Sequence, residues 1–349
     1  MPVQKKPPVN GRKSHLKLRT LADLARHLDV SMGKLQALAE QLDREREHTA
    51  LYHSWEQSKK SSGTRPIDAP REKLKRVQKR VNGTILQQLI VHPAARGGVR
   101  GRDLLSNVTP HIGKRTVDTY DLENFFLTVT SKRVYEFFCS VGCAPDVARL
   151  LTRITTFKGR LPQGAPTSPM LAVLVAGSGN NNSLYQRLQK LADKNNGDFT
   201  IYIDDITMSG AAHLPRLSGT IERIVQQSGF KINQKKTRFR EPHEQQTVTG
   251  IVVNKKPNVP RKERRRIRTV LHHYKNTGVQ NETNTLKSHL RGKIAHVQSV
   301  NPEQGVKLLS QFNAIDWTGT SSETVVSSPS GGSAGRTRAQ PRRGLPAGG

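Results

Sequence analysis

The sequence predicts an α+β fold with a mixed middle and helical ends. Residues 59–254 alternate short apolar runs suited to strands with Gly/Pro turns and helical segments. Apolar side chains recur at helical spacing over 21–42 and again over 286–312. Residues 1–19 and 318–349 have no apolar period, and their basic or Ser/Gly/Pro-rich composition predicts a flexible basic arm and a disordered tail.

The chain from 20 to 58 is predicted to be a small helical extension that contains a helical hairpin. Two apolar stripes carry this prediction: Leu21, Leu24, Ala25 and Leu28, then Leu35, Leu38, Ala39 and Leu42. A helix-turn-helix that reads DNA would have the same outline, with Ser31 capping its second helix. Two amphipathic helices packed against the next domain would give identical periodicity, so both interpretations stay open.

The composition points to a polyanionic partner. With 57 Lys and Arg against 27 Asp and Glu, the formal charge of +30 is far above what solubility requires. Each neutralised phosphate releases counterions, which makes nucleic acid the first candidate. An anionic membrane is the alternative, but no long amphipathic helix with a bulky apolar face accompanies the charge, so no membrane partner is expected.

Cysteine content and hydropathy indicate a cytoplasmic protein. Cys139 and Cys143 have helix-like spacing without the further Cys or His neighbours of a zinc site, so we expect buried, reduced thiols. The basic segment Met1 to Arg19 contains no apolar stretch of the kind found in signal peptides. The longest apolar run, Met170 to Ala176, is too short to cross a bilayer.

Two adjacent acids stand between alternating apolar runs in the segment from Thr200 to Thr207. The pattern predicts a strand, a tight turn at Asp204 and Asp205, and a second strand. Neighbouring carboxylates repel each other, and a plain turn would use Asn-Gly or Asp-Gly at lower cost. A divalent cation would remove that repulsion, although a solvated turn is the alternative for this motif alone.

A third acid occupies a similar place. The run from Val117 to Phe126 predicts a short strand that ends at Asp121 and leads into a helix. Phosphoryl transfer with two metal ions needs carboxylates from more than one strand, and Asp121 together with the adjacent pair supplies such a set. By position alone, Asp121 is also a candidate helix N-cap.

A rigid turn with three prolines precedes an apolar helix that is expected to start near Met170. It runs from Leu161 to Pro169, with Gln163-Gly164 in its middle, and such a turn can present its backbone to a flat ligand. Taken in chain order, the aspartate motif, Gln-Gly before Ser-Pro, and Tyr-x-Asp-Asp resemble the reverse transcriptase family.

The resemblance covers residues of about 59–317 and narrows to the bacterial retron reverse transcriptases. Further matching segments are Arg65–Pro70 followed by Leu74, Lys75 and Gln78; Ser106–His111; Gly229–Asn233 with Lys236 and Thr237; and Val248–Gly250. Val108 and Ile203 depart from the pattern, because both stand where retron enzymes commonly have alanine.

For the fold, this resemblance implies a right-hand polymerase, with fingers and palm over 59–254 and a helical RNA-binding thumb over 255–317. For the activity, it implies RNA-directed DNA synthesis on a cognate structured non-coding RNA. Synthesis would start from an RNA 2′-OH and give a branched RNA–DNA product. The implied partners are that RNA, dNTPs, a host RNase H and a separate effector protein in defence against phage.

The resemblance also assigns the catalytic site. Asp121, Asp204 and Asp205 would bind two Mg²⁺ ions, with the backbone carbonyl of Leu122 completing the shell of the second ion. One ion would activate the primer hydroxyl, and the other would hold the triphosphate and the leaving pyrophosphate.

Four residues are assigned to the incoming nucleotide: Arg65, Phe126, Gln163 and Lys236. Arg65 would bind the triphosphate, because a planar guanidinium suits phosphate. Lys236 would assist pyrophosphate departure. Phe126 would occupy the space of a ribose 2′-OH and so select DNA precursors, and Phe125 is the alternative gate.

The residues assigned to RNA lie in three segments: Asn107 and His111; Val248, Thr249 and Gly250; and Lys255, Lys256, Arg264, Arg265 and Arg268. Two other functions stay open. One is a bacterial reverse transcriptase of the intron, diversity-generating or defence type. The other is a nucleic-acid-binding protein with a dead polymerase site, against which the intact acids argue.

Overall fold

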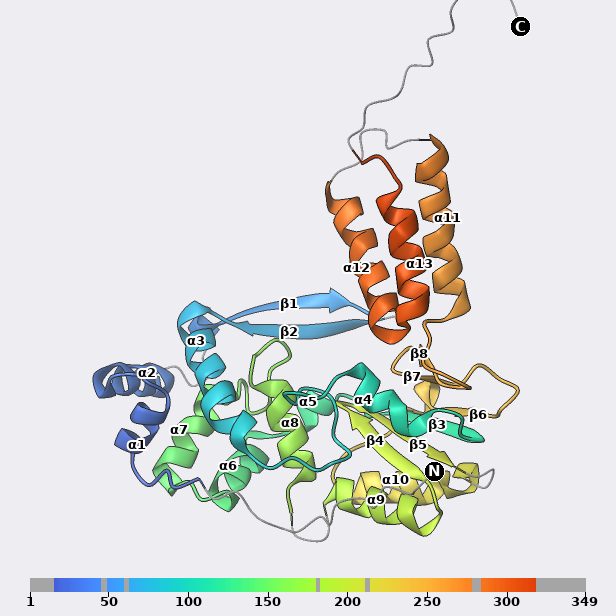
Figure 1. Ribbon diagram of the computed structural model, residues 1–349. Coiled ribbons are helices and arrows are strands. Elements are labelled where there is room, and N and C mark those ends of the chain that lie inside the picture. Colours follow the sequence, from blue (N-terminus) through green and yellow to red (C-terminus); the bar gives the residue numbers. More distant parts are fainter. Residues whose placement is uncertain are drawn as a thin grey trace, which may run out of the picture.

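The computed structural model describes residues 16–44, 49–59, 63–179, 183–210, 214–277 and 284–317. The predicted disordered tail and all but residues 16–19 of the predicted basic arm lie outside these ranges. The described chain forms a mixed sheet-and-helix body, with a group of helices standing apart at one end (Figure 1). No described helix is long and apolar enough to cross a membrane.

A four-stranded antiparallel sheet, the palm sheet, lies at the centre of the body. Its strand order is β4-β5-β3-β6, with β3 Thr116–Asp121, β4 Asp198–Tyr202, β5 Asp205–Gly210 and β6 Arg238–Arg240. The helices α9 (Leu184–Lys194) and α10 (Ser218–Gln227) lie beneath it (Figure 1). Side chains alternate between the faces, so Tyr120 and Ile206 enter the core while Asp121 and Asp205 reach the open face.

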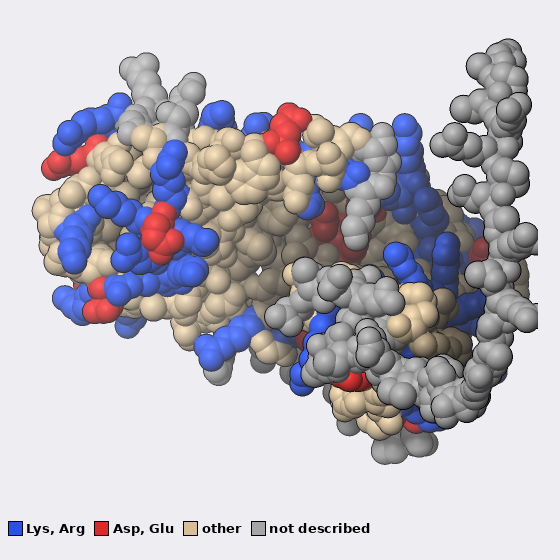
Figure 2. Space-filling model, turned by 90° about the horizontal axis from the view of Figure 1, so that it is seen from above, with Lys and Arg blue, Asp and Glu red and all other residues tan. Residues whose placement is uncertain are grey.

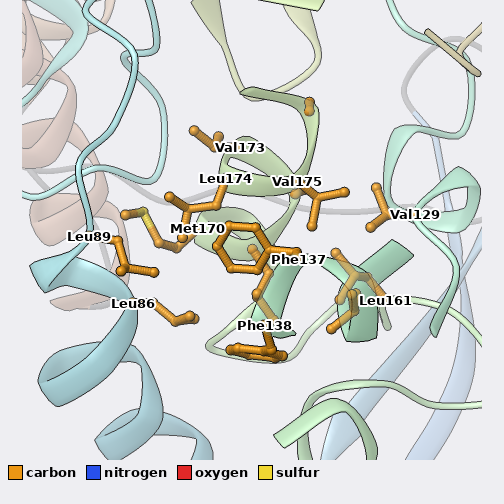
Figure 3. Close-up of a cluster of buried hydrophobic side chains, with 14 of the residues drawn as sticks. Leu86, Leu89, Val129, Phe137, Phe138, Leu161, Met170, Val173, Leu174 and Val175 are labelled. Carbon is orange, nitrogen blue, oxygen red and sulfur yellow. The ribbon is translucent and has the colours of Figure 1, made fainter. Parts of the chain in front are cut away.

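The fingers pack beside the palm sheet. They comprise β1 Tyr52–Ser58, β2 Thr64–Pro70, α3 Glu72–Arg80, α5 Phe125–Thr128, α6 Ser131–Ser140, α7 Pro145–Thr155 and α8 Ser168–Gly177. Their core contains Phe137 and Phe138 of α6 against Met170 and Leu174 of α8 (Figure 3). The residues of helix α8 from Met170 to Ala176 are apolar on every side of the helix, and all of them are buried.

The N-terminal extension packs on the outer side of the fingers. Helix α1 (Leu21–His27) begins with a capping box between Thr20 and Asp23, and α2 is Met32–Arg44. Both helices contact α7, and Leu28 and Leu42 enter the main core. Packing therefore accounts for the two apolar stripes. The predicted boundary at 58 is wrong, because residues 52–58 form strand β1 rather than helix.

The thumb is a bundle with its own core. Helices α11 (Arg261–Thr277), α12 (Asn284–Val300) and α13 (Pro302–Asn313) stand side by side above the palm (Figure 1). Ile267, Ile294 and Phe312 meet inside it, and the same core continues into the short hairpin β7 (Thr247–Val248) and β8 (Ile251–Val252). The predicted helical character of 255–317 is observed in α11, α12 and α13.

Short segments complete the chain: η1 Thr49–Leu51, η2 Val81–Ile85, η3 Leu86–Gln88, α4 Leu104–Val108, η4 Thr109–His111, η5 Leu214–Leu217 and η6 Gln234–Lys236. Both cysteines are free; Cys143 is buried, which raises its thiol pKa to about 12, whereas Cys139 is only partly buried.

Candidate active site

The two adjacent acids lie where the β4–β5 hairpin turns. Ile203 and Asp204 connect the strands, and Asp205 begins β5 opposite Tyr202. Ile203 has a φ of 60°, a left-handed conformation that is costly for a β-branched side chain. Gly97 packs closely here, because a Cβ atom at Gly97 would lie 2.5 Å from Ile203 Cγ1. Neighbours must fix such a conformation, so the turn is held in one geometry.

Asp121 lies beside this turn on the neighbouring strand β3. It pairs in register with Asp205, and the amide of Leu122 donates a hydrogen bond to the Asp204 carbonyl at 2.9 Å. The alternative of a helix N-cap is wrong for Asp121, because the N-cap of α5 is Asn124. Strand pairing therefore brings together the three acids that the sequence singles out.

Burial and repulsion between carboxylates shift Asp204 and Asp205 toward their neutral forms. Desolvation, followed by the charges of Asp204 and Asp121, raises the pKa of Asp205 to about 7. Desolvation also raises the pKa of Asp204. Lys236 Nζ donates to Asp121 Oδ1 at 2.8 Å, and this hydrogen bond raises the pKa of Lys236. One ammonium group faces three carboxylates, so ionising all three leaves an excess of negative charge.

The donor set fits Mg²⁺ by its chemistry. Carboxylate oxygens are the side-chain ligands that Mg²⁺ prefers, and a divalent cation would offset the repulsion that raises these pKa values. In the described part of the chain, no three His, Cys, Asp or Glu side chains already converge on one ion position. Lys236 instead holds Asp121. An ion bound by Asp121 must therefore compete with this ammonium group.

A cavity of about 330 Å³, lined mainly by polar residues, opens beside Asp121 and Asp205. Residues predicted from the sequence line part of it: Asp121, Asp205, Lys236, Thr249 and Gly250. The other lining residues were not predicted. They are Tyr120, whose side chain faces the core, and the polar residues Thr119, Thr207, Arg238, Arg240 and Thr247. Arg238 and Arg240 occupy alternate positions just after Lys236, and this period of two was the signal that could have indicated them.

Two residues predicted to contact the nucleotide lie on the fingers side, outside the lining of this cavity. The exposed guanidinium of Arg65 donates to Gln57 Oε1 across the β1–β2 hairpin at 2.7 and 3.1 Å. The carbonyl of Gln163 accepts from the Asp68 amide at 2.7 Å. This bond ties the Gln-Gly turn to β2, and Gly164, at φ 124°, lies against the Asp68 backbone.

The two candidate gate residues differ in burial. Phe125 is buried, and the centroid of its ring lies 5.3 Å from the centroid of the Phe230 ring. Phe126 is only partly buried and packs against the edge of the same core. Of the two rings, Phe126 therefore has the surface that a nucleotide would need.

Three of the residues predicted to bind RNA are buried: Asn107, His111 and Val248. His111 Nδ1 lies 2.6 Å from Ser209 Oγ, and its Nε2 lies 2.8 Å from Thr200 Oγ1. Buried side chains whose partners are other protein groups offer no atoms to RNA. Direct RNA contact by these three residues stays a prediction from the sequence.

The predicted thumb cations divide into two kinds. Lys255, Arg265 and Arg268 are exposed, and Lys256 pairs weakly with a glutamate of α13 at 3.9 Å. Arg264 is half-buried, and its guanidinium donates to the Val259 carbonyl just before α11 at 3.0 Å and to Gln304 Oε1 of α13 at 3.4 Å. It is a structural contact rather than a free charge. Figure 2 shows that Lys and Arg also cover the end of the molecule where α2 and α3 lie.

Comparison with known proteins shows the family to which the chain belongs. A family model described as reverse transcriptase (RNA-dependent DNA polymerase) matches residues 57–264. The retron Mx65 reverse transcriptase of Myxococcus xanthus is 35% identical over 83% of this chain and 70% of its own length. The retron Ec86 reverse transcriptase of Escherichia coli is 32% identical over 72% of this chain and 77% of its own length.

Among solved structures, a foamy viral protease-reverse transcriptase in complex with double-stranded DNA shows 16% identity and a TM-score of 0.42, covering 76% of this chain and 44% of its own. The family match and the curated relatives show the class of protein that the fold and the acids indicate, an RNA-directed DNA polymerase. Within that class, the chain belongs to the retron-type reverse transcriptases.

Proposed function

We propose that Asp121, Asp204 and Asp205 are the catalytic residues and that they hold two Mg²⁺ ions, with the Leu122 carbonyl as a further ligand. The pairing of β3 with β5 carries this proposal, because it sets Asp121 opposite Asp205 and beside Asp204 on the open face of the palm sheet. When bound, the ions would supply activation of the attacking hydroxyl and neutralisation of the triphosphate.

The remaining site residues would bind and select the nucleotide. Arg65 would leave Gln57 to bind the triphosphate, and the Gln163-Gly164 turn would support the base and sugar beside it. Phe126 would exclude a ribose 2′-OH, since its ring is the partly exposed one. Lys236, displaced from Asp121, would be free to protonate or pair with the departing pyrophosphate.

The biological reaction that we propose is that of a retron. The enzyme would copy part of its cognate non-coding RNA from an RNA 2′-OH in the bacterial cytoplasm, and host RNase H would trim the template of the branched hybrid. A separate effector protein would connect this product to phage defence. The similarity to named retron reverse transcriptases supports this reading, since it spans most of the chain.

RNA would be held by the thumb. The exposed cations Arg261, Lys262, Arg265, Arg266 and Arg268 lie along α11, while Ile267 and Leu271 turn inward. A helix with this division presents charge to phosphates without loosening its own packing. Phosphate contacts would give affinity, and the shape of the RNA would give most of the specificity.

Asparagine substitutions test the catalytic assignment. Asp204→Asn and Asp205→Asn should each abolish metal-dependent dNTP incorporation on an RNA template and leave RNA affinity unchanged. The matched control is Asp118→Asn, because Asp118 is also a buried palm carboxyl with its pKa raised to about 7 by desolvation. It lies on the core-facing side of β3, away from the cavity.

The outcomes separate the alternatives. Loss of synthesis in the two site variants, with activity kept in Asp118→Asn, supports the proposal. Retained synthesis in purified Asp204→Asn would overturn the site assignment. A wild-type protein that binds RNA but incorporates no dNTP with any divalent metal would instead be a nucleic-acid-binding protein with a dead polymerase site.

A further inference from the structure

The segment from Asn107 to Arg115 runs between the catalytic strands and the Thr249-Gly250 turn. On one side it is fixed to the palm hairpin, since His111 bridges Thr200 of β4 and Ser209 of β5 at 2.8 and 2.6 Å. His111 is fully buried. These two short contacts tie both strands of the hairpin that turns at Asp204 to this segment.

On its other side the segment is tied to residues 246–253 by hydrogen bonds at three points. The Gly113 amide donates to the Val253 carbonyl at 2.9 Å, and Gln246 Nε2 donates to the Arg115 carbonyl at 2.9 Å. Asn107 Nδ2 reaches Thr249 Oγ1 at 3.4 Å, a longer contact. Apolar packing reinforces these bonds, because Val108 and Val248 share the thumb-side core.

These two sets of contacts fix one wall of the cavity beside the acids. Thr249 and Gly250 line that cavity together with Asp121 and Asp205. Both residues have positive φ, 45° and 83°, so the turn adopts a conformation that Thr would not take unaided. The volume of about 330 Å³ suits one nucleotide rather than a duplex.

The incoming nucleotide would approach the acids from the fingers side. Three of the four residues that we assign to the incoming nucleotide, Arg65, Phe126 and Gln163, do not line this cavity; the fourth, Lys236, lines it where it pairs with Asp121. The nucleotide whose hydroxyl attacks must reach the same acids from another direction. The cavity between β6 and the Thr249-Gly250 turn offers it hydroxyl groups and two arginines, a lining suited to a sugar and its phosphate.

We propose that residues 107–115 form a brace that positions the priming nucleotide, with His111 and Asn107 as positioning residues that act through the Thr249-Gly250 turn. This rests on the proposed function and deepens it. His111 and Asn107 position the RNA primer without contacting it. They set the distance between the carboxylates and the cavity wall against which the attacking ribose lies.

Steady-state kinetics with separate titration of primer–template and dNTP tests the brace. His111→Leu removes both buried hydrogen bonds and keeps the bulk, so KM for the primer–template should rise about tenfold while KM for dNTP stays within about twofold. His111→Gln keeps a donor and an acceptor and should recover most of the loss. Thr249→Val should raise the primer–template KM by a smaller factor of about two to three, because its contact is long.

Gln78→Leu is the matched control. Gln78 is equally buried, and its amide donates to Tyr52 Oη at 3.0 Å and to the Ile154 carbonyl at 2.8 Å, within the fingers. This variant should lose comparable thermal stability with an unchanged primer–template KM. If His111→Leu folds poorly, Asn107→Ala and Thr249→Val with their double variant replace it, and non-additive KM effects are expected.

Two results would overturn the brace. One is an unchanged primer–template KM in folded His111→Leu and Thr249→Val. The other is an equal rise in both KM values, which would mean a general loosening of the site. Failure of the proposed function looks different, because it appears as synthesis that survives Asp204→Asn or that is missing from the wild-type protein.

Discussion

The palm and the thumb use charge in opposite ways. In the palm, Asp204 and Asp205 are so far withdrawn from water that desolvation is the main cause of their raised pKa values. In the thumb, the cations of α11 other than Arg264 lie in solvent, and only Ile267 and Leu271 of that helix are buried. The palm site therefore depends on the placement of a few atoms, whereas the thumb depends on a sum of charges.

This difference predicts that small changes in the palm have large effects. Gly97→Ala should lower kcat about 100-fold, because its Cβ would push the Ile203 turn and displace the neighbouring carboxylates. RNA affinity should stay unchanged. Single-turnover dNTP incorporation and RNA binding, measured on the same preparation, check both statements.

The control comes from the thumb. At Gly292 of α12, an added Cβ would meet no atom of the described neighbouring residues within 4 Å. Gly292→Ala should therefore stabilise the protein by about 0.5–1 kcal/mol and leave kcat alone. Wild-type kcat in Gly97→Ala would show that the turn tolerates displacement, and the contrast between the two regions would weaken.

The sugar gate is the next test of placement in the palm. Phe126→Ala should raise the ratio of rNTP to dNTP incorporation about tenfold or more, since it removes the ring that would meet a 2′-OH. Phe125→Ala should instead destabilise the fold by about 3–5 kcal/mol, because that ring lies in the core. A changed ratio in Phe125→Ala with none in Phe126→Ala would transfer the gate to Phe125.

Metal affinity should depend on pH near neutrality. The pKa of Asp205 is raised to about 7, so below that pH a proton competes with the ion for the carboxylate. Apparent Mg²⁺ affinity should thus fall by up to about tenfold per unit as the pH drops from about 7 to about 6. Mg²⁺-induced shifts in Tm across this range measure it.

Two variants decide whether that proton belongs to Asp205. Asp205→Asn should flatten the pH dependence and weaken Mg²⁺ binding at every pH. Asp118→Asn should keep the wild-type profile, although burial raises the pKa of Asp118 to a similar value. An unaltered profile in Asp205→Asn would assign the proton elsewhere.

Local sequence patterns were enough to predict several secondary-structure elements and the positions of the three acids relative to them. The hairpin at Asp204 and Asp205, the strand ending at Asp121 and the thumb helices follow from periodicity, because each is specified by residues close in the chain. Strand β1 was missed, since its sequence Tyr52–Ser58 has no buried alternation: six of its seven residues are exposed. An exposed hairpin strand gives no period of two in hydropathy.

Long-range pairings account for what the sequence could not predict. In the sequence, Asn107 and His111 are polar residues that could contact RNA. In the structure they form hydrogen bonds with protein residues that lie 142 and 98 positions away in the chain. In the sequence Arg264 resembles its basic neighbours, and only its folded contacts, with the Val259 carbonyl and with Gln304 of α13, show that it is structural. Charge alone does not distinguish a free arginine from one held by a carbonyl.

The thumb should respond to substitution in small, nearly equal steps. Arg265→Gln and Arg268→Gln should each lower the affinity for every RNA by a similar factor. Each should also reduce the slope of log affinity against log salt concentration by about 0.7–0.9, because one phosphate contact is lost. Preference between cognate and non-cognate RNA should barely change. Exchange of the segment 248–317 for that of another retron enzyme should, by contrast, redirect the preference.

Arg264→Gln separates charge from structure within the same helix. It removes the same unit of charge as its neighbours, but its guanidinium is occupied by the Val259 carbonyl and Gln304 Oε1. We therefore expect a loss of about 1 kcal/mol in stability and an unchanged salt slope. Competitive RNA binding at two salt concentrations, with thermal unfolding, measures both. A slope that falls as far as in Arg265→Gln would mean that Arg264 leaves its carbonyl to meet phosphate, and that the thumb rearranges when RNA binds.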